Sequence, residues 1–109
     1  MQYLKKEYLR GLYINTRHRI IHDEILSIGG LDSSILHPRD VFKPALEYNA
    51  YGVILAHNHP SGECEPSASD LETTKRIVQA GTLLQIPLMD HLIVGANSYF
   101  SFNKQGLMM

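Results

Sequence analysis

A short apolar run, Val53 to Ala56, constrains this chain more than any other feature. It follows Gly52 directly, has no polar interruption, and lies between two stretches in which apolar residues recur at helical spacing. Consecutive apolar residues of this kind are typical of a central strand covered on both faces. The run therefore predicts a sheet with this strand inside it and helices packed against the sheet.

The other segments alternate between strand and helix patterns. Residues 15–18 predict a tight hairpin connection between two antiparallel strands, and Gly29-Gly30 ends the second of them. Pro38 stands at a first-turn position where helices tolerate proline, whereas Pro44 is the weak point of the same helix. The predicted strands are 7–15, 19–28, 53–56, 86–94 and 99–102, and the predicted helices are 38–49 and 67 to about 80 or one turn further. This order indicates an α/β fold with a mixed sheet.

Length and composition narrow the class of protein. At 109 residues, with 44% hydrophobic and 19% charged residues, the chain is expected to form one globular domain over 1–109. Its single cysteine, Cys64, excludes an internal disulfide. The sequence contains no apolar run near the roughly 18 residues of a membrane span and no signal peptide, so we expect a cytoplasmic protein with no membrane contact.

The segment from His57 to Asp70 carries the chemistry. His57 and His59 are two residues apart in extended chain, so both rings can face one point, and Pro60 keeps His59 extended. The Pro-rich loop that follows can bring Asp70, in the first turn of the next helix, to the same point. Three protein ligands with one open position are typical of a catalytic zinc site. The alternative is two surface histidines and an N-terminal helix cap formed by Ser67 with Asp70.

The same residues resemble a known family. HNHPSG followed by PSASD is similar to the signature of RadC-type proteins, a bacterial branch of the JAMM (MPN-plus) metalloproteases. The resemblance extends from about Tyr8 to Leu107. It is carried by the segments GLYINTRHRII, HPRDVFKPAL, ILAHNHPSG, PSASD and LMDHLIVG.

This resemblance implies a cytidine-deaminase-like α/β/α sandwich, the JAB or MPN domain, that holds Zn²⁺. His57, His59 and Asp70 match the family's three ligands, and Ser67 matches its serine. A glutamate on an early strand polarises the zinc-bound water in this family, and the match by position in IIHDEILSIGG is Glu24. Strand alternation independently puts Glu24 on the more apolar side of its strand, where a carboxylate is costly without a role or a partner.

The implied reaction is hydrolysis of a peptide or isopeptide bond by a metal-activated water. Glu24 would act as the general base and Ser67 would donate to the developing oxyanion. The substrate would be a peptide or protein of a kind that the sequence does not specify, and the oligomeric state is equally open.

The alternative function is a non-catalytic accessory or binding module associated with DNA repair. It is motivated by the family's name and by residues 1–19, which hold five basic residues, including Lys5 and Lys6, against one acidic residue. The formal net charge of −1 gives no general attraction to nucleic acid.

Two further residues lie near these motifs. Cys64 is in the loop between the ligands, and we expect it to be incidental rather than a fourth ligand. His91 is either a residue that orients a ligand or, as we expect, a core histidine with its hydrogen bonds satisfied.

Overall fold

The computed structural model describes residues 7–28, 36–60 and 62–108 of the chain, and the seven predicted elements are present in the predicted order. The five strands are β1 (Tyr8–Ile14), β2 (Ile20–Ile28), β3 (Gly52–Asn58), β4 (Leu88–Val94) and β5 (Tyr99–Ser101). The two helices are α1 (Pro38–Glu47) and α2 (Ala68–Leu84). The glycines Gly29 and Gly30 and the basic residues Lys5 and Lys6 lie outside the described residues.

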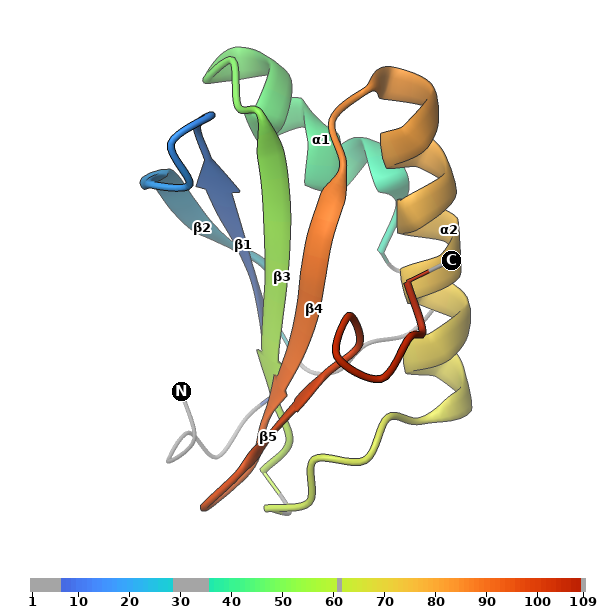
Figure 1. The fold of residues 1–109 in the computed structure, drawn as a ribbon. Coiled ribbons are helices and arrows are strands. Elements are labelled where there is room, and N and C mark those ends of the chain that lie inside the picture. Colours follow the sequence, from blue (N-terminus) through green and yellow to red (C-terminus); the bar gives the residue numbers. More distant parts are fainter. Residues whose placement is uncertain (1–6, 29–35, 61, 109) are drawn as a thin grey trace.

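The strands form one mixed sheet in the order β2-β1-β3-β4-β5 (Figure 1). Neighbouring strands are antiparallel except β3 and β4, which are parallel. Because β1 lies between β2 and β3, the first strand of the chain pairs with the central strand, and Leu9 is opposite His57. This pairing brings the start of β1 to the end of β3.

Both helices pack on the same face of the sheet, where they lie next to each other (Figure 1). The Tyr13 hydroxyl of β1 donates to the Val41 carbonyl oxygen of α1 over 2.6 Å, and on the same face Thr74 of α2 contacts His91 of β4. In the described residues the fold therefore has two layers, which differs from the expected α/β/α sandwich.

The sheet order explains this difference. The connections β2-α1-β3 and β3-α2-β4 each join parallel strands, and both move in the same direction along the sheet. Crossovers of one hand place their helices on opposite faces only when the direction of travel reverses. Here it does not reverse, so both helices lie on one face.

The core lies between the helices and this face. Its buried members are Leu9, Tyr13, Leu36, Val41, Phe42, Ala45, Ala50, Val53, Leu55, Ile77, Ile86 and Leu88. The opposite face of the sheet carries the partly buried Leu12, Ile54 and Leu92, so the central strand is not fully covered on both sides. Within the described part of the chain, no helix has the length and apolar character needed to cross a bilayer.

Candidate metal centre

The end of β3 places two histidines beside each other. His57 is fully buried and is the second-last residue of β3, and His59 follows the strand with 16% of its side chain exposed. Their Nε2 atoms are 3.0 Å apart. The His59 N–H donates to the Val94 carbonyl oxygen at the end of β4, and its ring Nδ1 lies 3.0 Å from the Glu63 carbonyl oxygen. The expected convergence of the two rings is therefore present.

A close contact between two glycines fixes the loop after His59. A Cβ atom on Gly95 would lie 2.6 Å from the carbonyl oxygen of Gly62, a distance that only glycine accommodates. Gly62 itself has a φ of 88°, in the left-handed region that favours glycine. The loop is thereby held against the turn between β4 and β5.

Asp70 reaches the histidines from the first turn of α2. Its Oδ1 is 3.5 Å from His57 Nε2, and its Oδ2 is 3.4 Å from His59 Nε2. A capping box holds it there, because the Ser67 N–H donates to Asp70 Oδ2 over 2.8 Å and the Asp70 N–H donates to Ser67 Oγ over 3.0 Å. Burial alone would raise the pKa of Asp70, but the adjacent His57 ring and the Ser67 N–H outweigh it and lower that pKa to about 2. Asp70 is therefore a carboxylate at neutral pH.

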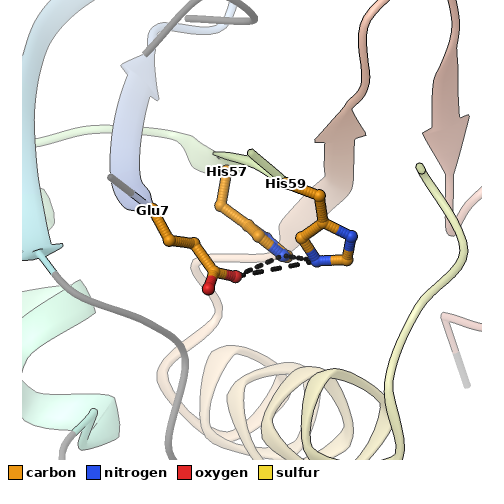
Figure 2. A group of neighbouring side chains, drawn as sticks. All are labelled: Glu7, His57 and His59. Carbon is orange, nitrogen blue, oxygen red and sulfur yellow. Dashed lines mark hydrogen bonds and ion pairs between the residues drawn. The ribbon is translucent and has the colours of Figure 1, made fainter. Parts of the chain in front are cut away.

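Glu7 completes the cluster from the residue before β1. Its Oε1 lies 3.7 Å from His57 Nε2 and 3.6 Å from His59 Nε2, and Figure 2 shows the carboxylate pointing at both rings. The Tyr8 N–H donates to the buried Asn58 Oδ1 over 2.7 Å, which ties the start of β1 to the end of β3. With 27% of its side chain exposed, Glu7 is open to solvent where Asp70 is not.

These atoms match the dimensions of a zinc site. Zinc binds His nitrogen and carboxylate oxygen at about 2.0–2.2 Å in tetrahedral geometry, which puts the ligand atoms roughly 3.3–3.5 Å apart. The two histidines and Asp70 are separated by 3.0, 3.4 and 3.5 Å, and Glu7 is slightly further away. The residues present therefore fit a divalent metal with imidazole and carboxylate ligands.

The structure puts Glu24 elsewhere. It lies on β2 opposite Gly11, and its Oε1 contacts His22 Nε2 at 2.7 Å. Its side chain is 43% exposed. The neighbours expected on its apolar side are Ile20, Leu26 and Ile28: Leu26 packs against the core, whereas Ile20 and Ile28 are 57% and 58% exposed because β2 is an edge strand. The carboxylate gathered with the histidines is that of Glu7, and the sequence interpretation missed it.

A signal for Glu7 was present in the strand pattern. Residues 7 and 9 share one face of β1, and Leu9 is opposite His57. Strand alternation alone would have placed Glu7 beside the histidines if β1 had been known to pair with β3.

The remaining predicted residues are placed as follows. The oxygen of Ser67 caps α2, and a hydroxyl that accepts one hydrogen bond can still donate its own hydrogen. Cys64 Sγ contacts Ser98 Oγ at 3.2 Å. His91 is fully buried and stacked on Phe102, and it contacts His57 directly.

The sequence is similar to known proteins over nearly its whole length. The family described as the RadC-like JAB domain matches residues 1–107. The chain is 48% identical over 108 residues to a UPF0758 protein of Alkaliphilus metalliredigens, covering 99% of this chain and 47% of that protein. It is also 46% identical over 103 residues to a UPF0758 protein of Pelodictyon phaeoclathratiforme, covering 94% of this chain and 46% of that protein. A UPF0758 protein of Methanococcoides burtonii is 47% identical over 103 residues, covering 94% of this chain and 45% of that protein. The chain thus spans about half the length of the curated relatives it matches.

Proposed function

This chain belongs to the family of RadC-like JAB domains, and we propose that it is a zinc-dependent hydrolase of peptide or isopeptide bonds. The observation that carries the proposal is the convergence of His57, His59 and Asp70 at zinc-site spacing, with the Glu7 carboxylate beside them. Zinc would be held by His57, His59 and Asp70, the three groups with the shortest mutual separations.

Glu7 is the proposed general base. A zinc ion in this site would supply a Lewis acid that makes a water molecule nucleophilic near neutral pH. The Glu7 carboxylate is partly exposed and more distant than Asp70, so it can accept the proton of the attacking water and pass it to the leaving amine. In this proposal Glu7 takes the place of Glu24, whose carboxylate contacts His22 instead.

Ser67 and Asp70 have linked tasks in this proposal. The capping box fixes the Asp70 carboxylate toward the histidines, and the Ser67 hydroxyl hydrogen can stabilise negative charge on the substrate carbonyl oxygen.

The first test is metal content. The parent and the His57→Ala variant are purified without added metal and measured by elemental analysis. We expect about one zinc per chain in the parent and none in the variant. A parent that takes up no zinc, even when zinc is offered at neutral pH, would contradict the proposal and favour the accessory binding module.

The second test compares two identical substitutions, Glu7→Gln and Glu24→Gln. Turnover is measured on libraries of fluorescence-quenched peptides and isopeptide-linked peptides, together with zinc content. We expect Glu7→Gln to keep its zinc and to lose roughly 10²–10⁴-fold in turnover, the usual contribution of a general base. Glu24→Gln serves as the matched control, and we expect it to retain both. Loss of zinc in Glu7→Gln would instead make Glu7 a ligand, and loss of turnover in Glu24→Gln alone would restore Glu24 as the base.

A further inference from the structure

The second ring nitrogen of His57 begins a chain of hydrogen bonds that runs away from the metal centre. His57 Nδ1 lies 2.7 Å from His91 Nε2, and His91 Nδ1 lies 2.6 Å from Thr74 Oγ1. Thr74 Oγ1 in turn lies 2.7 Å from the Asp70 carbonyl oxygen, one turn earlier in α2. The two histidines are fully buried and Thr74 is 1% exposed, so water does not compete for these bonds.

The end of this chain sets its direction. A carbonyl oxygen can only accept, so the single hydroxyl hydrogen of Thr74 belongs to the bond with Asp70. Thr74 Oγ1 must then accept from His91 Nδ1–H. The His91 ring is fully buried and lies against His57, Thr74 and Phe102, so it is neutral and carries one hydrogen. With that hydrogen on Nδ1, His91 Nε2 accepts from His57 Nδ1–H.

We propose that Thr74 and His91 are positioning residues that hold His57 in the tautomer with a bare Nε2, ready to bind zinc. The inference rests on the proposed function for the identity of the metal, but the tautomer itself is a property of the metal-free chain. His59 is prepared separately, because its Nδ1–H donates to the Glu63 carbonyl oxygen and leaves its own Nε2 bare. Two bare nitrogens 3.0 Å apart repel each other, and a cation between them relieves that repulsion.

Reversing the chain would block the site. If Thr74 had no hydroxyl, His91 Nδ1–H would be a buried donor without an acceptor, which is costly. Moving that hydrogen to His91 Nε2 leaves a bare Nδ1 there in place of the unpaired N–H, but His57 Nδ1 must then accept and His57 carries its hydrogen on Nε2. That hydrogen occupies the position where zinc binds, although no ligand has been changed.

The test uses Thr74→Val, which removes the hydroxyl at nearly constant volume, and Thr74→Ser, which keeps it. Thr82→Val is the matched control, because Thr82 Oγ1 on the same helix makes the same kind of bond to the Val78 carbonyl oxygen over 3.0 Å without contacting the histidines. Zinc dissociation constants are measured by competition with a chromogenic chelator. We expect Thr74→Val to weaken zinc binding roughly 10- to 100-fold and the other two variants to stay within about 3-fold of the parent.

A second readout follows the tautomer directly. Side-chain ¹⁵N shifts of His57 are recorded in the metal-free proteins at about pH 8. We expect hydrogen on Nδ1 in the parent, Thr74→Ser and Thr82→Val, and on Nε2 in Thr74→Val. Hydrogen on Nε2 in the parent, or a Thr74→Val variant identical to the parent in tautomer and zinc affinity, would overturn the inference. A parent with the expected tautomer but no hydrolytic activity would refute the proposed function and leave the inference standing.

Discussion

Replacing Tyr13 with Phe tests how much the hydrogen bond between β1 and α1 contributes to stability. The Tyr13 side chain is fully buried, and its hydroxyl donates to the Val41 carbonyl oxygen over 2.6 Å. A net contribution of about 1 kcal/mol is usual for such a bond, so Tyr13→Phe should lower the free energy of unfolding by about that amount at neutral pH. For a domain of this size the melting temperature should fall by roughly 4–8 °C.

The same substitution should also change the response to alkali. Burial, with a smaller contribution from the Glu24 carboxylate, raises the pKa of Tyr13 above its ordinary value of 10.0. The folded state therefore holds this proton more tightly than the unfolded state. The contribution of this proton to the free energy of unfolding is fully present below the pKa that Tyr13 has in the unfolded chain. Above that pKa the contribution falls by about 1.4 kcal/mol per pH unit. The parent should thus lose its advantage of about 1 kcal/mol over Tyr13→Phe by roughly pH 11.

Urea unfolding of the parent and of Tyr13→Phe, from neutral pH to roughly pH 11, measures the difference between their free energies of unfolding. Tyr51→Phe is the control. Tyr51 is 45% exposed, so removal of its hydroxyl should leave the free energy of unfolding close to that of the parent. A gap for Tyr13→Phe that does not change with pH, or a variant more stable than the parent at neutral pH, would refute the reasoning.

Three other perturbations have defined outcomes. Zinc at about 100 times its dissociation constant should add about 2.7 kcal/mol to the stability and raise the melting temperature by roughly 10–20 °C, with chelator reversing the shift; thermal melts that do not respond to zinc would contradict this. Ser67→Ala should cost about 1 kcal/mol through loss of the α2 cap and should also weaken zinc binding through Asp70, as unfolding and chelator-competition titrations would show. Gly81→Ala should destabilise by about 1 kcal/mol despite the better helix propensity of alanine, because the added Cβ would lie 2.7 Å from the Ile86 carbonyl oxygen; a stabilised variant in urea unfolding would show that this contact relaxes freely.

The order of strands and helices could be predicted from the sequence, because periodicity and turn residues are local signals. The apolar run at Val53 identified the central strand, and the HNHP motif identified the two histidines at its end. Asp70 could be placed as well, since the capping pattern fixes where α2 begins. These features depend on residues close together in the chain.

The face of the sheet on which each helix packs and the identity of the fourth residue could not be predicted, because both depend on strand order. Glu24 is the prediction from the resemblance of the segment IIHDEILSIGG to the family. In the structure Glu7 is the glutamate beside the histidines, and it reaches them only because β1 pairs with β3. Hydrophobic patterning does not distinguish this pairing from others. His91 likewise has the pattern of a core residue, and its contact with His57 follows from the parallel pairing of β3 and β4.

The separation of these residues along the chain orders the assembly of the site. His57, His59 and Asp70 fall within one strand, one loop and one helix start, so their loop closes quickly in a folding chain. Glu7 is 50 residues from His57 and joins them only after β1, which forms a hairpin with β2, has paired with β3, a slower event of high contact order. Under the proposed function, a refolding chain can therefore bind its metal before its general base is in place. For the proposed hydrolase, activity should return later than metal binding, and the delay measures the time that β1 needs to pair with β3.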